Sequence, residues 1–257
     1  MRKILIRADD LGYSEAVNYG IEKSVKNGLI RSVGVMMNMP ATSHGIALLE
    51  KEDIAFGQHT NICVGRPLTD PKHIPSLVDE AGSFKSSTDY RTAEQDFVVF
   101  EEVLLEIGAQ YQAFLSAFGR KPDYFEGHAI VSETFFRALE YFANQHGLTY
   151  SGLPENVNPN AMTNNEFVFI NDQKVYLVME GMFPDYNPTQ MFERTIKNLP
   201  EDGVSMLIFH PGYLDDYILN HSSLLIARTK EVEMLINPNW PVFLAENKVT
   251  CIDYREL

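Results

Sequence analysis

Short apolar segments and longer segments of helical periodicity alternate along most of the 257 residues of this chain. The apolar runs predict strands at residues 3–8, 29–37, 54–56, 122–125, 148–150, 204–209 and 249–252. The amphipathic segments predict helices at residues 15–27, 44–51, 92–118, 132–146, 189–198 and 222–236, the third of them with a bend near Gly108. Such alternation is typical of a parallel sheet with helices packed outside it. At this length we expect an irregular (β/α) TIM-like barrel with fewer than eight regular strands.

One segment departs from this alternation. Residues 152–174 are rich in Asn and Pro, and two apolar runs at 167–170 and 175–178 flank Asn171-Asp172-Gln173. This pattern predicts a β-hairpin. We interpret residues 152–180 as an insertion within one catalytic domain that covers residues 1–257. The glycine motif of dinucleotide-binding folds is absent after the first strand, where Asp9-Asp10-Leu11-Gly12 stands instead.

Composition limits the partners of the chain. The formal net charge is −14, which argues against nucleic acid or an anionic membrane surface as a partner. The two cysteines, Cys63 and Cys251, form no CxxC pair, so a thiolate zinc site is not expected. The apolar run at the N-terminus is too short for a signal peptide, and no apolar stretch is long enough to span a bilayer. These features predict a reduced, cytoplasmic protein, and they leave a homodimer open.

Two adjacent carboxylates, Asp9 and Asp10, end the first apolar run. Two acids this close repel each other unless a cation or a shared proton relieves them. If the chain bends where the strand ends, both can reach one cleft, with Asp10 as a metal ligand and Asp9 as a base beside it. The alternative is a helix N-cap, because Asp is favoured there.

Three of the seven histidines also follow apolar runs: His59, His128 and His210. In barrel enzymes the carboxyl ends of the strands carry the chemistry. One carboxylate and two imidazoles are a common catalytic metal set, and we assign Asp10, His59 and His128 to it. His210 precedes Pro211-Gly212, so it fits better as an acid or electrophile on a rigid turn. A single histidine after a strand is more often structural than catalytic, and Pro211-Gly212 could be a plain turn.

These motifs resemble those of the YdjC-like family, which includes chitooligosaccharide deacetylases. The resemblance rests on motifs in the family's order, with similar patterns in the loop and near the C-terminus: Ala8-Asp9-Asp10-Leu11-Gly12, Gly57-x-His59, Gly127-His128, His210-Pro211-Gly212-Tyr213, Gly82-Ser83-Phe84 and Arg228-x-x-Glu231-x-x-x-Leu235. Two positions depart from the pattern. Ile130 stands where the family often has a second histidine, and Gln58 stands where it usually has an apolar residue.

The resemblance implies an irregular (β/α) barrel and metal-dependent removal of N-acetyl groups from amino-sugar oligosaccharides. It implies Asp10, His59 and His128 as ligands of one divalent ion, Asp9 as base and His210 as acid. Gly212 and Tyr213, in the same motif as His210, become candidate substrate contacts. Mixed nitrogen and oxygen ligation favours Zn²⁺ or another transition metal, and Mg²⁺ stays compatible.

The segment from residue 64 to residue 90 is rich in Pro, Gly, Asp and Ser, which predicts a long loop, and such loops are often functional. Phe84 could stack on a sugar ring or could pin the loop to the core. Arg66 could bind the phosphate of a phosphorylated disaccharide or could pair with a surface carboxylate.

Three other functions stay open at this point. One is a glycosidase acting on a phosphorylated β-disaccharide such as cellobiose phosphate, although its two carboxylates would have to flank the bond. Another is a non-haem iron oxygenase, which uses the same two-histidine, one-carboxylate set. The last is a sugar-binding protein without enzymatic activity, in which the metal is structural.

Overall fold

The computed structural model describes residues 2–130, 132–153, 161–162, 166–181 and 183–257. The strands are β1 Arg2–Leu11, β2 Ser32–Val35, β3 Ala55–Thr60, β4 Tyr124–Gly127, β5 Ala161–Met162, β6 Phe167–Ile170, β7 Gln173–Glu180, β8 Val204–Phe209 and β9 Val249–Ile252. The α-helices are α1 Glu15–Lys26, α2 Thr42–Leu49, α3 Ser87–Thr92, α4 Phe100–Phe118, α5 Glu133–His146, α6 Pro188–Lys197, α7 Asp216–His221, α8 Ile226–Leu235 and α9 Trp240–Glu246.

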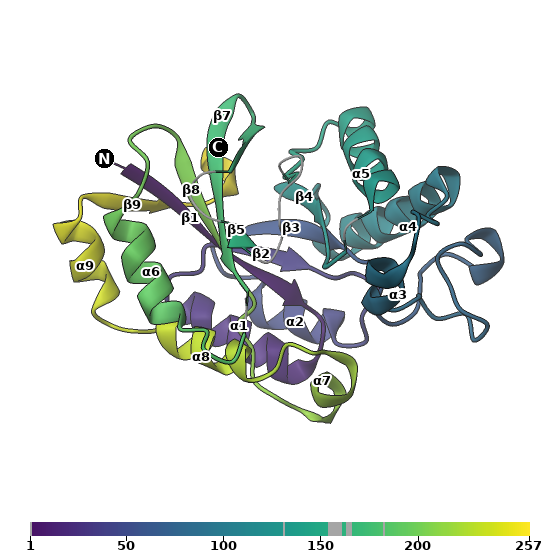
Figure 1. Cartoon of the computed structure of the whole chain (residues 1–257), viewed down its shortest axis with the longest axis horizontal. Coiled ribbons are helices and arrows are strands. Elements are labelled where there is room, and N and C mark those ends of the chain that lie inside the picture. The colour runs from purple at the N-terminus through teal and green to yellow at the C-terminus, as the bar shows by residue number, and fades with distance from the viewer. Residues whose placement is uncertain (1, 131, 154–160, 163–165, 182) are drawn as a thin grey trace.

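The sheet is built around β1 (Figure 1). Its hydrogen-bonded order is β4-β3-β2-β1-β8-β7-β5, with β6 on β7, and with β9 beside the first half of β1. The strands from β4 to β7 are parallel, and β5 and β6 run antiparallel to β7. The sheet is curled into a half-barrel, so the predicted α/β class and irregular (β/α) barrel are confirmed.

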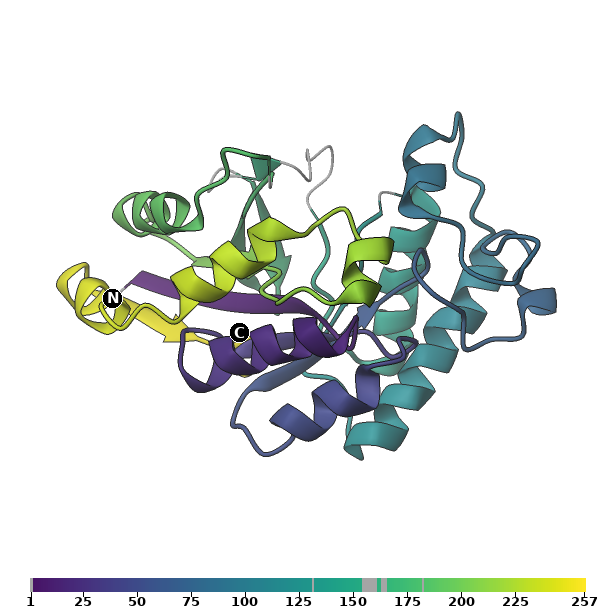
Figure 2. The same ribbon diagram turned by 90° about the horizontal axis from the view of Figure 1, so that it is seen from below.

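The helices pack on the outside of this sheet. In both views α1, α2 and α8 lie along one side of it (Figures 1 and 2), while α4 and α5 pack against each other next to β3 and β4. Alternate residues of β1 enter different cores, because Ile4 and Ile6 belong to the cluster with these helices and Leu5 belongs to a cluster on the inner face. The inner face is therefore the one on which Arg7 and Asp9 also stand.

The hairpin forms as the sequence predicts, since β6 and β7 pair antiparallel around Asn171 and Asp172, which both have positive φ. In addition, β7 pairs in parallel with β8, so the second strand of the hairpin belongs to the main sheet. Residues 154–160 and 163–165 of the expected insertion lie outside the described residues. That the whole chain is one catalytic domain stays a prediction.

Several predicted boundaries are wrong. The helix expected at 92–118 begins only at Phe100. The Asp96 carboxylate accepts hydrogen bonds from Val98 N–H and from Ser132 and Thr134 at the start of α5, and these bonds hold residues 93–99 outside a helix. From there α4 runs through Gly108 as one helix. The strand expected at 148–150 is reduced to one isolated bridge.

The C-terminal part of the chain also differs from the prediction. The helix expected at 222–236 begins only at Ile226, as α8, because the backbone of Leu225 is not helical, with φ −118° and ψ −91°. The short helix α7, which ends at His221, was not predicted. The short helix α9 was not predicted, and the last strand has the predicted bounds. None of the helices in the described residues combines the length and the apolar composition needed to cross a membrane.

Candidate metal centre

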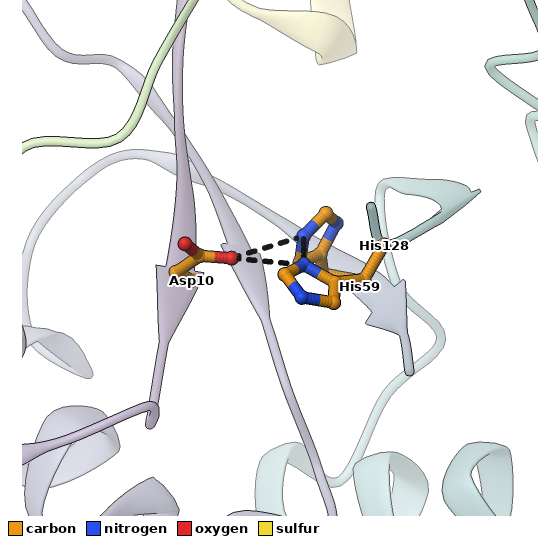
Figure 3. Close-up of side chains that lie close together, drawn as sticks. All are labelled: Asp10, His59 and His128. Atoms are coloured by element: carbon orange, nitrogen blue, oxygen red, sulfur yellow. Dashed lines mark hydrogen bonds and ion pairs between the residues drawn. The ribbon is translucent and has the colours of Figure 1, made fainter. Parts of the chain in front are cut away.

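Asp10, His59 and His128 meet at the carboxyl ends of β1, β3 and β4 (Figure 3). Asp10 Oδ1 lies 3.3 Å from His59 Nε2 and 3.1 Å from His128 Nδ1, and the two nitrogens are 2.9 Å apart. All three residues are buried, with exposed fractions of 1%, 2% and 7%. The structure thus brings together three side chains separated by up to 118 positions in the sequence, as predicted.

The residues present fit a divalent cation. Bonds of 2.0–2.2 Å at tetrahedral or octahedral angles place neighbouring ligand atoms about 2.9 to 3.5 Å apart, and the three separations fall in this range. Within the described part of the chain, Asp10 Oδ1 is buried and has no hydrogen bond of acceptable geometry. A buried carboxylate oxygen that lacks a hydrogen bond is costly. An ion held between the three atoms would remove that cost.

A local irregularity of β1 turns Asp10 toward the histidines. Strict alternation would place Asp10 on the helix-facing side, with Ile4 and Ile6. The register between β1 and β2 shifts between Ala8 and Leu11, and Asp10 has a φ of +75°, a left-handed conformation that Asp tolerates better than most residues. Asp9 and Asp10 can therefore both approach His59, which is the geometry the sequence predicted from a bend at this point.

Glu126 fixes the orientation of the His59 ring. Its carboxylate makes a short hydrogen bond to His59 Nδ1. With the proton on Nδ1, the lone pair of Nε2 is directed at the site. Carboxylates that orient metal-binding histidines in this way also raise the basicity of the ligand. Glu126 directly precedes the Gly127-His128 motif in the sequence, and its role was not predicted.

Arg7 holds the second carboxylate of the site. Its guanidinium nitrogens lie 2.8 Å from both oxygens of Asp9, and Nη2 lies 3.6 Å from Glu126 Oε2. Gly34 in β2 leaves the room for this arrangement, because a Cβ there would stand 3.0 Å from Asp9 Oδ1 and 3.2 Å from His59 Cβ. Asp9 is thus buried, fixed and directly beside the three candidate ligands, as a base would need to be.

Charge in the site acts on both Asp10 and His59. Burial raises the pKa of Asp10, but Arg228, whose Nη2 lies 2.7 Å from Asp10 Oδ2, and the two histidines outweigh burial and hold the pKa well below its usual range. Burial lowers the pKa of His59, but Glu126, Asp9 and Asp10 outweigh it, so the pKa is raised well above 6.5. His59 therefore carries a proton that a metal ion must displace.

His210 follows β8 at the same end of the sheet. Burial lowers its pKa to about 4, against the opposing charges of Asp10 and Asp9, so the ring is neutral at pH 7. Its Nδ1 is buried and has no hydrogen-bond partner among the residues that the structure describes. A neutral imidazole can act as the predicted acid only if it gains a proton during the reaction.

The four predicted substrate contacts, Phe84, Arg66, Gly212 and Tyr213, differ in burial and in their neighbours. Phe84 is 5% exposed and packs in the core under the loop, which is the anchoring role that the sequence left open and gives its ring no free face for a sugar. Arg66 is exposed, and its guanidinium donates to the Ala81 carbonyl at 2.9 Å. Gly212 packs against Gly20 of α1 so closely that a Cβ on Gly20 would lie 2.4 Å from Gly212 Cα.

Tyr213 is partly buried, and it lines a cavity of about 480 Å³ together with residues of α6 and α8. Ile130, at the position where the family often has a histidine, is 4% exposed and packs in the apolar cluster around α4 and α5. It supplies no ligand, and Asp10, His59 and His128 form the set without it. The substrate roles of Arg66, Gly212 and Tyr213 stay predictions.

A buried two-histidine, one-carboxylate set at the carboxyl ends of the strands of a (β/α) half-barrel defines a candidate metal centre of a kind that hydrolases use. Residues 3–246 match the profile of the YdjC-like protein family. The chain therefore belongs to the YdjC-like family, and the resemblance seen in the motifs is confirmed.

Two relatives align over almost their full length. A carbohydrate deacetylase of Clostridium beijerinckii is 29% identical over 265 residues, covering 99% of this chain and 100% of the relative. Carbohydrate deacetylase 2 of Listeria innocua is 30% identical over 259 residues, covering 99% and 98%.

Solved structures show the same fold. A protein of Enterococcus faecalis, for which cleavage of cellobiose phosphate has been suggested, has a TM-score of 0.78 at 22% identity and covers 99% of this chain and 98% of its own. A family 4 acetyl xylan esterase of Clostridium thermocellum, solved with a cobalt ion, has a TM-score of 0.50 at 13% identity and covers 99% of this chain and 89% of its own.

Proposed function

We propose that this protein is a metal-dependent hydrolase that removes N-acetyl groups from amino-sugar oligosaccharides of the chitobiose or chitooligosaccharide type. The observation that carries the proposal is the triangle of Asp10 Oδ1, His59 Nε2 and His128 Nδ1, with Asp9 fixed beside it. The two relatives named carbohydrate deacetylase support the choice of reaction. The chemistry of the ligand set favours Zn²⁺ or another transition metal and is compatible with Mg²⁺.

A divalent ion at this centre would acidify a bound water and polarise the acetamide carbonyl. Asp9 takes one proton from the water as its oxygen attacks the carbonyl carbon. The C–N bond then breaks, and the departing nitrogen requires a proton in order to leave as an amine. His210 is the proposed donor. Because its pKa is about 4 in the resting protein, it must take up that proton after the substrate has bound.

The glycosidase alternative finds less support in the carboxylates of the site. A retaining or inverting glycosidase needs one protonated acid across the bond from a second carboxylate. Here Asp9 and Glu126 lie side by side on the same guanidinium, that of Arg7, and not across a bond from each other. Cleavage of a phosphorylated disaccharide therefore requires an acid other than these two.

An acetate-release assay tests the proposal. Metal-loaded protein is incubated with N-acetylglucosamine, chitobiose, longer chitooligosaccharides and chitobiose phosphate, and with cellobiose phosphate as the unacetylated comparison. We expect acetate from at least one acetylated sugar, its loss after treatment with a chelator, and its return on adding Zn²⁺ or Mg²⁺. Release of monosaccharide without acetate would support the glycosidase. Saccharide binding without any product would support a binding protein, and oxygen-dependent turnover with Fe²⁺ would support an oxygenase.

A further inference from the structure

Arg228 of α8 joins the candidate metal centre to the turn that carries His210. Its side chain is 2% exposed, and each nitrogen has a defined acceptor. Nη2 donates to Asp10 Oδ2 at 2.7 Å, Nη1 to the His210 carbonyl at 3.3 Å, and Nε to the Leu224 carbonyl at 3.0 Å. One guanidinium thus contacts a candidate metal ligand and the backbone of the candidate acid.

Glu231 lies three residues further along α8, on the same helix face. It is completely buried, and both of its carboxylate oxygens accept hydrogen bonds. Oε2 accepts from the backbone N–H of His210 at 2.6 Å, and Oε1 accepts from the Tyr186 hydroxyl at 2.7 Å. The backbone N–H and C=O of His210 are therefore both held by side chains of one helix.

The two oxygens of Asp10 have different partners. Oδ2 is paired with Arg228, whereas Oδ1 faces His59 and His128. A carboxylate held at one oxygen in this way can offer only the other to a metal. Arginine offers separate nitrogens of one planar fork to Asp10 and to the His210 carbonyl, whereas a lysine offers a single nitrogen.

We propose that Arg228 is a positioning residue, which holds Asp10 Oδ2 so that only Oδ1 is available to the metal, and which connects this ligand to the His210 turn. Glu231 holds the same turn by accepting a hydrogen bond from the backbone N–H of His210. The part that concerns His210 rests on the proposed function. The part that concerns Asp10 does not, since it requires only that the three residues bind a metal.

Cobalt(II) tests the Asp10 part without any substrate. Metal-free protein is loaded with one equivalent of Co²⁺, whose visible absorption depends on the number and geometry of its ligands. In Arg228→Met both oxygens of Asp10 become free, so we expect a higher coordination number and a weaker, shifted band. Glu231→Gln, which keeps an acceptor for His210 N–H, should retain the wild-type spectrum. Arg120→Met is the matched control, because Arg120 pairs with Asp123 at the opposite end of β4.

Kinetics test the His210 part. We expect Arg228→Met to lower kcat by about 10- to 100-fold with little change in KM, as is common for residues that orient metal ligands. Arg228→Lys keeps the charge and should restore part of the loss. Glu231→Leu should lower kcat with an unchanged Co²⁺ spectrum, whereas Glu231→Gln should retain most of the activity.

The outcomes separate the two proposals. If Arg228→Met does not fold, because it leaves Asp10 without its buried partner, Arg228→Lys is the variant that decides. A folded Arg228→Lys with a wild-type Co²⁺ spectrum and wild-type kcat overturns the positioning role. If the wild type releases no acetate from any sugar, the proposed function fails, while the Co²⁺ spectra still decide whether Arg228 positions Asp10.

Discussion

Replacing Asp9 by Asn tests the assignment of the base. The two side chains have nearly the same shape, but Asn cannot accept a proton from water. Asp9 stands beside the three candidate ligands and not among them, so the variant retains all three of these side chains. A positioned general base contributes about 10²- to 10⁴-fold to a rate. We therefore expect kcat to fall by this factor, which corresponds to about 3 to 5 kcal/mol in the activation free energy.

The measurement requires saturation of the metal site first. Asp9→Asn removes one negative charge and leaves Arg7 without its closest partner, so we expect metal affinity to fall by about 10- to 100-fold, as for other residues outside the ligand set. Metal content is determined by titration, and acetate release is then followed at saturating metal. Glu126→Gln is the comparison, because it removes a charge from the same cluster and should act mainly on metal affinity through His59.

Two results would refute this reasoning. Acetate release within about tenfold of the wild type at saturating metal would show that Asp9 is not the base. Complete loss of metal binding, at concentrations that saturate the wild type, would show that Asp9 is itself a ligand. The second result would favour Asp9, His59 and Glu126, which form another buried group that could hold an ion among the described residues.

Three further predictions concern the ligands, the pH dependence and the loop. His59→Ala should abolish both metal binding, measured by titration, and acetate release. Because the pKa of His59 is raised well above 6.5, its proton must leave when metal binds. The affinity for metal should therefore fall by about tenfold for each pH unit below that pKa. Calorimetry in buffers of different ionisation enthalpy should detect the released proton. A pH-independent affinity between pH 6 and 8 would contradict this. Phe84→Ala should lower the free energy of unfolding by about 3 to 5 kcal/mol in denaturant titrations and leave KM unchanged. A raised KM with unchanged stability would instead support sugar stacking.

The strand and helix pattern predicts the fold class well, because apolar periodicity directly reflects which side chains are buried. The misplaced boundaries have tertiary causes. Asp96 prevents the first part of the predicted long helix from forming by binding the start of α5, and periodicity does not report such a contact. The single bridge at Tyr150 likewise depends on β4 and not on local propensity.

The sequence predicts the candidate ligands because they follow apolar runs, and parallel strands bring their carboxyl ends together. It does not predict the residues that orient them. Arg7 and Asp9 are two positions apart in one strand, so their shared face was available as a signal. Arg228 and Glu231 share a helix face by the same kind of argument, but nothing in their spacing names Asp10 or His210 as partners.

The most direct test of the metal centre is anomalous diffraction from a crystal of this protein soaked with Zn²⁺ or Co²⁺. We predict a single strong peak among Asp10, His59 and His128, about 2.0 to 2.2 Å from Oδ1, Nε2 and Nδ1. A peak at another site, or none among these three side chains at saturating metal, would contradict the account.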